Sequence, residues 1–325
     1  QIVALLKKVA GGLQIKNVAD RTQVRLNKER FLSDDFKALW DQIKYRTTFM
    51  VDFDVDQLIT DCAEAIKKNV NVPKARYVYT VAAADITRAG VDMEKKRSQT
   101  QVFEQENLTP PDILSVLQND TNLTRKSLVA ILRKAGNLFA FKRNPTKYIE
   151  QVTKIIKAKM QTFIVDGIKY HRLGDNEFYG QELFKDEELF GYLERDMVEG
   201  NMVEAKDRSI YEHVVCDSKV ERGFAEGLNA SEEVKVFAKL PSWFKIDTPL
   251  GSYNPDWVVL VKKADGQEER LFFVVETKGE VMFDEALRPT EVAKIKCGEA
   301  HFKALGTNVV FEKASSYDAF MGTIG

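Results

Sequence analysis

Apolar residues recur at helical spacing near the start of the chain. Behind Ser33, which can cap a helix, apolar side chains follow at i, i+3, i+4 and i+7 and end at Ile43. A second helical stripe begins near Asp56. Between the two, residues 47–53 alternate in polarity as a half-buried strand does. This part of the chain is therefore predicted as helix, strand and helix.

Three short helices are predicted next, because each apolar stripe follows an N-terminal signal. The first would begin at Thr109, with Pro110 in the first helical position. The second would begin behind Thr124 and end at Gly136, and the third would begin behind Asn144. Together with the preceding elements they indicate a mixed, mainly helical domain over residues 1–165.

From about residue 163 the chain changes to short strands and turns, and we place a second domain over residues 166–325. The order of the helices and strands expected in this domain predicts an α/β (α+β) fold around a mostly antiparallel sheet. The expected elements are a helix over 214–228, strands over 234–240 and 243–246, a hairpin over 256–263 and 271–276, a helix over 288–305 and a strand over 309–311.

Composition describes a globular protein, with 44% hydrophobic and 30% charged residues among 325. No run of 18 apolar residues and no signal-peptide pattern occurs, so we expect a cytoplasmic protein with no membrane partner. The chain begins with Gln1, and we interpret it as a fragment of a longer protein. Its three cysteines lie far apart without a CxxC pair, which excludes a zinc-finger or disulfide scaffold.

The net charge of −1 hides a strong asymmetry. Residues 121–160 carry ten Lys or Arg against one acid, whereas residues 173–207 carry eleven acids against three bases. A basic stretch of this kind can bind a phosphate backbone, although charge alone favours solvated helix faces as the explanation. Residues 112–117 and 124–134 have helix-turn-helix spacing, which also occurs in plain helical bundles. The DNA contacts expected there are Arg125, Lys126, Arg133 and Lys134.

Two apolar strands joined by a polar turn carry the residues of greatest chemical interest. A hairpin centred on Gly266 sets Asp256 opposite Glu276, because each lies ten residues from the centre. A strict two-residue turn would instead pair Asp256 with Val275, so we expect a longer loop or a bulge. Glu276 and Lys278 are two apart on one strand and share a face.

Two carboxylates with a nearby lysine suit phosphodiester hydrolysis. The carboxylates can hold Mg²⁺ against a phosphate, and the lysine can position water or stabilise developing negative charge. Pro255-Asp256 followed by Glu276-Thr277-Lys278 resembles the PD-(D/E)xK nuclease motif. That motif alone is weak, since surface carboxylates and lysines give the same pattern by chance.

The surrounding residues are more specific. They run through residues 217–225, 234–241, 244–251 and 253–257, and continue through 276–279 and 287–302. Over roughly residues 205–305 this succession is similar to the nuclease domain of type III restriction subunits. The resemblance implies a restriction-endonuclease-like PD-(D/E)xK domain, cleavage of double-stranded DNA, and Mg²⁺ with Mn²⁺ as a substitute. It also implies work in complex with a modification (methyltransferase) subunit.

The resemblance also assigns roles to individual residues. Asp256 and Glu276 match the metal carboxylates, Thr277 would offer its main-chain carbonyl, and Lys278 matches the catalytic lysine. Glu221 would lie near the metal, unless it only caps its helix or pairs with Lys219 or Arg222. Two lysines of the following helix are expected to reach the DNA backbone, unless they are ordinary surface residues: Lys294 and Lys296.

The first half of the chain resembles the same family more loosely. Residues 36–47 look like the region that follows the motor domains, and the match thins between about 70 and 108. No phosphate-binding loop occurs, so we expect no ATP site in this chain and place it in N-terminal helicase domains of the parent chain. Two alternatives stay open: a repair or junction-resolving nuclease of the same fold, and an inactive DNA- or partner-binding scaffold.

Overall fold

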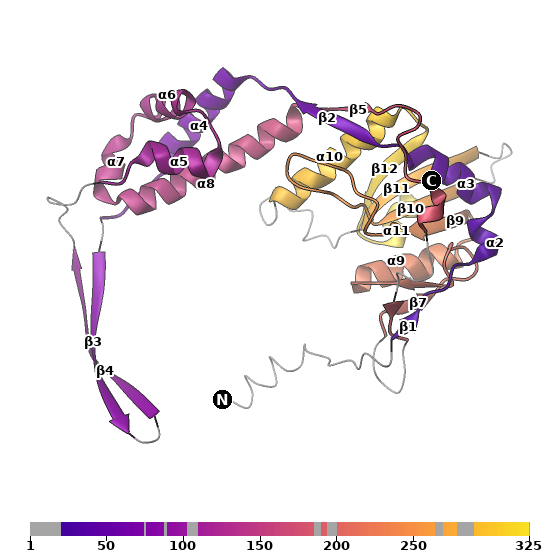
Figure 1. The fold of residues 1–325 in the computed structure, drawn as a ribbon, viewed down its shortest axis with the longest axis horizontal. Helices are drawn as coiled ribbons and strands as arrows, with labels where there is room; N and C mark the ends of the chain where they lie inside the picture. The colour runs from indigo at the N-terminus through magenta and orange to yellow at the C-terminus, as the bar shows by residue number, and fades with distance from the viewer. Residues whose placement is uncertain are drawn as a thin grey trace. The chain divides into compact units, whose positions relative to one another are not determined.

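The computed structural model (Figure 1) divides into two compact units. Gln1–Val51 and Ile168–Gly325 form the first, here called the sheet unit, and Asp52–Gly167 form the second, the helical unit. None of the helices in the described ranges has the length and apolar content that a membrane crossing needs. The structure describes residues 21–74, 76–87, 90–102, 110–184, 190–193, 200–263, 269–277 and 289–324.

The helical unit is built from capped helices whose apolar stripes share one core. Buried residues of α4, α5, α6 and α8 form that core. Two strands add an antiparallel ribbon, β3 with β4. The elements are α4 (Val55–Asn69), β3 (Arg76–Thr87), β4 (Gly90–Val102), α5 (Ile113–Thr121), α6 (Arg125–Ala135), α7 (Leu138–Arg143) and α8 (Pro145–Asp166).

Two of the three predicted helix starts in this unit are confirmed. Thr124 caps α6 and Asn144 caps α8, although α8 is 22 residues long rather than short. The start at Pro110 is wrong: α5 begins behind Asp112, whose carboxylate accepts the Leu114 amide at 3.0 Å. Because Pro110 itself precedes a proline, helical backbone is disfavoured there. Thr109 lies outside the described residues.

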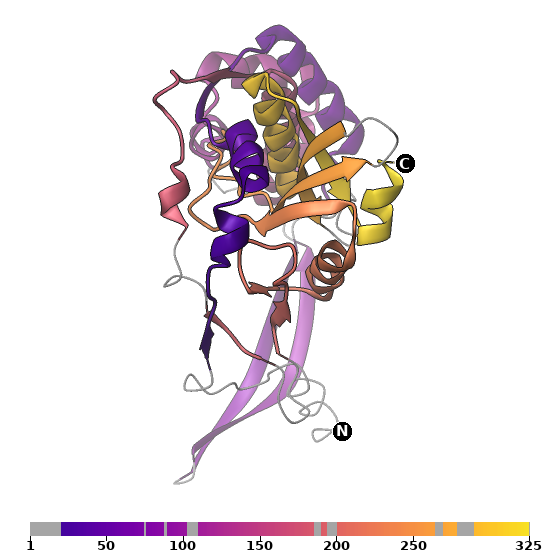
Figure 2. The ribbon, with the colours of Figure 1, turned by 90° about the vertical axis from the view of Figure 1, so that its right-hand side faces the viewer.

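A four-stranded sheet in the order β12-β11-β10-β9 is the centre of the sheet unit. β9 (Val234–Lys239), β10 (Trp257–Lys263) and β11 (Glu269–Thr277) are antiparallel, and β12 (Val309–Ala314) runs parallel to β11. Helices α9 (Lys219–Ala230) and α11 (Tyr317–Gly322) lie on one face, and α3 (Asp34–Ile43) and α10 (Pro289–Leu305) on the other (Figure 2). The predicted mostly antiparallel sheet is confirmed.

Residues 21–51 belong to the sheet unit, whereas the sequence placed them in a first domain of residues 1–165. β2 (Thr47–Val51) pairs with β5 (Ile168–Arg172), although the whole helical unit lies between these two strands in the sequence. Trp40 of α3 also packs edge-on against Phe184, with ring centroids 4.9 Å apart. The predicted boundary near residue 165 therefore marks the end of the helical unit, but that unit starts at Asp52.

Short elements complete the sheet unit and correct two further expectations. The predicted helix over 214–228 begins only at Lys219, behind Ser218, because residues 213–215 form β8. Residues 243–246 form no strand and contribute a single bridge, Ile246 to Tyr253. The remaining elements are β1 (Thr22–Gln23) with β6 (Phe190–Gly191), β7 (Met202–Glu204) with β8 (His213–Val215), α2 (Lys28–Phe31) and the 3₁₀ helix η2 (Gln181–Leu183).

Two glycines on α9 give a matched test of this packing. A Cβ on Gly227 would lie 2.3 Å from Tyr317 Cγ of α11, whereas a Cβ on Gly223 would meet no atom within 4 Å. Alanine favours a helix over glycine by about 1 kcal/mol, and overpacking costs about 1–3 kcal/mol. In urea unfolding, Gly223→Ala should therefore raise the free energy of unfolding and Gly227→Ala should lower it. Equal effects of the two substitutions would contradict the close approach of α9 and α11.

Candidate active site

The β10–β11 hairpin brings the two predicted carboxylates to one end of the sheet. Its register pairs Trp257 with Val275, and the next step sets Asp256 opposite Glu276. The prediction of a hairpin centred on Gly266 is therefore confirmed, and the strict two-residue turn is excluded. The connecting residues 264–268 lie outside the described residues.

Asp256 is held by the last residue of β11. Its Oδ2 accepts two hydrogen bonds of 2.8 Å from Thr277, one from the backbone amide and one from the hydroxyl. The Thr277 hydroxyl oxygen in turn accepts the indole N–H of Trp257 at 3.0 Å. Because Trp257 is fully buried, this chain of bonds fixes the Asp256 side chain from the core. The sequence had suggested only a main-chain carbonyl role for Thr277.

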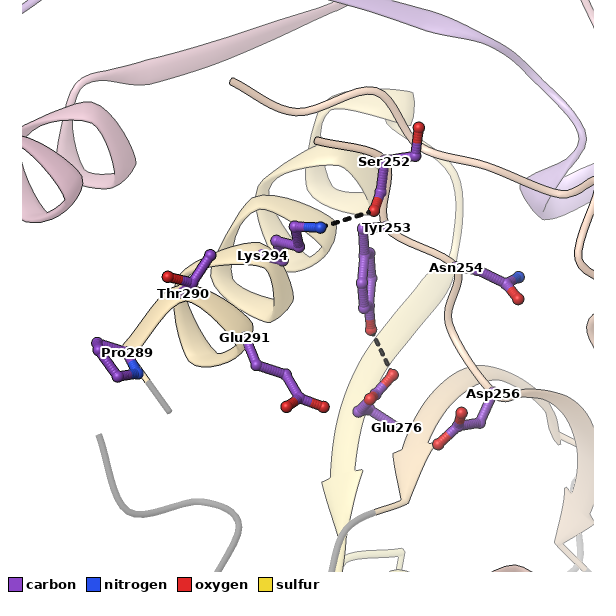
Figure 3. Close-up of a pocket in the computed structure, with 9 residues that line it drawn as sticks. All are labelled: Ser252, Tyr253, Asn254, Asp256, Glu276, Pro289, Thr290, Glu291 and Lys294. Carbon is purple, nitrogen blue, oxygen red and sulfur yellow. Dashed lines mark hydrogen bonds between the residues drawn. The ribbon is translucent and has the colours of Figure 1, made fainter. Parts of the chain in front are cut away.

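Glu276 is held from the other side by a residue to which the sequence gave no role. Glu276 is only 3% exposed, and its Oε2 accepts the Tyr253 hydroxyl at 2.6 Å (Figure 3). Burial, and then the charge of Glu276, raises the pKa of the Tyr253 phenol well above its usual value of 10. Tyr253 therefore stays protonated at neutral pH and remains the donor in this bond.

The two carboxylates open on a pocket of about 540 Å³. Helix α10 supplies one wall, where Lys294 Nζ donates to the Ser252 carbonyl at 3.2 Å. From the same helix the Glu291 carboxylate reaches toward Glu276 (Figure 3). Its place in the first turn of the predicted helix was visible in the sequence, but its proximity to Glu276 was not. The lining residues are Ser252, Tyr253, Asn254, Asp256, Glu276, Pro289, Thr290, Glu291 and Lys294.

Glu221 does not line this pocket. Its Oε2 accepts Lys239 Nζ at 2.7 Å and the Asp217 amide at 2.9 Å. This is the alternative that the sequence left open, a capping and pairing role, although the partner is Lys239 of β9 rather than Lys219 or Arg222.

Of the other predicted site residues, one lies outside the described residues and one does not line the pocket. Lys278, the expected catalytic lysine, lies outside the described residues. Lys296 is exposed on α10 and does not line the pocket, in contrast to Lys294. Of the two lysines expected to reach the DNA backbone, Lys294 thus lies beside the carboxylates.

The four basic residues of the helical unit that are predicted to contact DNA have different neighbours. Helices α5 and α6 follow one another through a left-handed turn at Asn122, with φ of 57°. Arg125 lies 3.8 Å from the Asp112 carboxylate, and Lys134 donates to the Thr60 hydroxyl at 2.7 Å. The other two predicted DNA contacts, Lys126 and Arg133, have exposed side chains.

Burial disfavours two other kinds of catalytic group. It raises the pKa of Cys62 and Cys297 to about 11 and that of Cys216 to about 12, so all three remain neutral thiols at pH 7. It lowers the pKa of His301 to about 3, and Nδ1 of this ring lies 2.7 Å from the Thr47 hydroxyl oxygen. These four residues therefore offer neither a thiolate nucleophile nor an imidazolium acid.

The pocket offers the donor set of a hard cation. Asp256 and Glu276 present carboxylate oxygens, which Mg²⁺ prefers, and Mg²⁺ commonly takes one or two carboxylates while keeping several waters. Within the described ranges, no group of three or more His, Cys, Asp or Glu is arranged to hold a metal ion. Asp256 and Glu276 are therefore the two residues of the pocket that would hold Mg²⁺.

Comparison with models of protein families gives a match over part of the chain. Residues 207–317 match the family model of an endonuclease domain (RE_endonuc), and this range contains all the residues that line the pocket. The chain has no significant match to a curated protein or to a solved structure. Over residues 207–317 the chain is therefore similar to a restriction-endonuclease-like domain, and the general activity that this similarity supports is that of a nuclease.

Proposed function

We propose that this chain is the nuclease-bearing part of a type III restriction subunit. In this proposal it hydrolyses phosphodiester bonds of double-stranded DNA, with Mg²⁺ or Mn²⁺ held by Asp256 and Glu276. The observation that carries the proposal is the pair of hydrogen-bonded carboxylates at one end of the sheet, inside the endonuclease match. The run of residues around the pair favours the type III family over repair nucleases of the same fold.

The chain's own residues orient the groups that act on the phosphate. Thr277 and Tyr253 hold one oxygen of each carboxylate, so little reorganisation is needed when charge develops. Bound Mg²⁺ would act as a Lewis acid that neutralises this charge. Thr277 would add its main-chain carbonyl as a ligand, and Lys278 would position the attacking water or stabilise the developing negative charge.

DNA contacts are also proposed for two groups of basic residues. Lys294 and Lys296 would bind the backbone beside the scissile phosphate. Arg125, Lys126, Arg133 and Lys134 would bind it from the helical unit, where the last two are neighbours on α6. Arg125 would have to leave Asp112, which is a small cost because exposed ion pairs contribute at most about 1 kcal/mol.

The proposed partners follow from the family resemblance. A modification (methyltransferase) subunit would recognise the DNA sequence, and helicase domains of the same parent chain would bind ATP and move along DNA. The complex would work in the cytoplasm.

Removal of either carboxylate should abolish cleavage without unfolding the chain. Asp256→Asn and Glu276→Gln preserve side-chain shape but remove the negative charge that would hold Mg²⁺. Without the metal ion, the transition state would lose a stabilisation of several kcal/mol. Since about 1.4 kcal/mol is a factor of ten in rate, we expect plasmid cleavage with Mg²⁺ to fall by at least about 100-fold. The matched control is Glu226→Gln on α9, whose side chain pairs with Arg222 and should not matter for cleavage. Near wild-type cleavage by Glu276→Gln would show that the site is assigned wrongly.

Lys278→Ala should reduce cleavage far more than DNA binding. One lysine adds little to an interface with many phosphate contacts, whereas in the reaction it acts on the attacking water or the developing charge. We expect near-normal affinity in gel shifts and cleavage reduced by orders of magnitude. Equal losses in both assays would make Lys278 a phosphate-binding residue instead.

Salt dependence tests the proposed contacts on α6. In a plot of the logarithm of the DNA association constant against the logarithm of the salt concentration, each phosphate neutralised by the protein contributes about −0.9 to the slope. Arg133→Glu with Lys134→Glu should therefore flatten the slope by about two units, with little change in melting temperature because both side chains are exposed. Lys67→Glu with Lys68→Glu, at the end of α4, is a control of equal charge. An unchanged slope in the α6 variant would remove this surface from the proposal.

A further inference from the structure

Helix α7 of the helical unit turns apolar and basic side chains outward. Its inner residues, Ala140 and Phe141, pack against the core of the unit. The Phe139 side chain is 70% exposed, whereas Phe178 and Phe190 of the sheet unit are 45% and 42% exposed. The helix therefore presents an open aromatic ring between cations. Its exposed residues are Leu138, Phe139, Lys142 and Arg143.

The backbone that carries this ring is fixed to the core. Asn137, the residue before α7, accepts the Tyr148 hydroxyl of α8 at 2.7 Å, and its carbonyl accepts the Ala140 amide at 2.9 Å. The Phe141 ring lies edge-on to the Tyr148 ring, with centroids 5.7 Å apart. Because Tyr148 is fully buried, these contacts join α7 to the core of the helical unit. The fold itself therefore holds Phe139 at the surface.

The charge of the chain around α7 is positive. Residues 121–149 contain seven Lys or Arg and no Asp or Glu. The first acid after them, Glu150, lies 2.6 Å from Lys147. On α7 itself, the Arg143 guanidinium lies over the Phe139 ring, 5.3 Å from the ring centroid. A ligand that contacts this ring therefore also meets cations, which favours a polyanion as the ligand.

We propose that α7 binds single-stranded DNA, with one base stacked on the Phe139 ring and the neighbouring phosphates on Lys142 and Arg143. The proposal goes beyond the function of the pocket, because this binding needs neither the two carboxylates nor a metal ion.

The chemistry of α7 matches an unpaired nucleotide. Every base has a face that stacks on an aromatic side chain, and arginine adds a cation–π contribution. In a duplex the neighbouring base pairs cover these faces, so a ring on a protein surface reaches them only by insertion and unstacking. A protein partner fits less well, since stable protein interfaces bury about 1,200–2,000 Å² and the two exposed apolar side chains supply little of that area.

The test measures the affinity of the intact chain for a labelled deoxythymidine oligomer of about 12 nucleotides, a length within common site sizes of about 4–16. Fluorescence anisotropy is recorded in EDTA, so that the DNA is not cut. Phe139→Ala should raise the Kd for the oligomer by about 5-fold or more, as expected when one stacked base is released. The Kd for a duplex of the same length should change by less than about 2-fold, because its bases offer no open face.

Phe139→Trp tests for rescue, because an indole also offers an aromatic face to a base. This variant should bind the oligomer nearly as tightly as the wild type does. The three native tryptophans lie in the sheet unit, so the added emission reports on α7. Binding of the oligomer should quench that emission.

Phe178→Ala in the sheet unit is the matched control. The Phe178 ring also contacts a cation, with Lys44 Nζ 5.1 Å from its centroid, but Lys44 is paired with Asp41 at 2.6 Å. This variant should keep the wild-type Kd for the oligomer. Melting curves check that each variant is folded.

A weaker affinity for the oligomer in Phe139→Ala, with rescue in Phe139→Trp and no change in Phe178→Ala, supports the proposal. Equal losses for the oligomer and the duplex would refute base stacking. The proposal also falls if the wild type does not bind the oligomer, or if folded Phe139→Ala binds it as the wild type does. None of these results depends on cleavage, which Asp256→Asn tests separately.

Discussion

The hydrogen bonds from Thr277 to Asp256 join the start of one strand to the end of its neighbour, and the geometry of the pocket depends on them. They form only in the register that pairs Trp257 with Val275. A slip by one residue would turn alternate side chains to the opposite face and separate Asp256 from Glu276. Such a slip would also exchange the side chains of the two buried faces, for example Phe273 for Val274, and would disturb their close packing.

Helix α10 connects this sheet to the chemistry of the pocket. The absence of a side chain at Gly298 lets the Tyr253 ring lie against the helix, and the hydroxyl then reaches Glu276. Lys294, one turn earlier on the helix, holds the same loop at the Ser252 carbonyl. A carboxylate that is 3% exposed is costly to bury without such a partner. The packing of the Tyr253 ring on α10 is therefore also what places a hydrogen-bond donor at the buried Glu276 carboxylate.

Much of the hairpin could be predicted from the sequence, because its information is local. Two apolar runs and a polar turn centred on Gly266 are enough to set Asp256 opposite Glu276. Contacts between distant segments could not be predicted in this way. Nothing near Glu221 indicates Lys239 as its partner, and nothing near Tyr253 indicates that α10 will press its ring toward the pocket. The assignment of residues 21–51 failed for the same reason, since it depends on strands that are far apart in the chain.

The pairing of β2 with β5 also has a consequence for synthesis. β2 ends at Val51 and its partner begins at Ile168, with the whole helical unit between them. At a translation rate of about 5–20 residues per second, about 6–23 s pass between the synthesis of β2 and the synthesis of β5. The inserted helices can fold during that interval, and their closing bond, from the Asp52 amide to the Gly167 carbonyl at 3.0 Å, brings the two ends of the insert together. The nascent insert would then act as a template that delivers β5 to β2, so its folding would precede and accelerate completion of the nuclease.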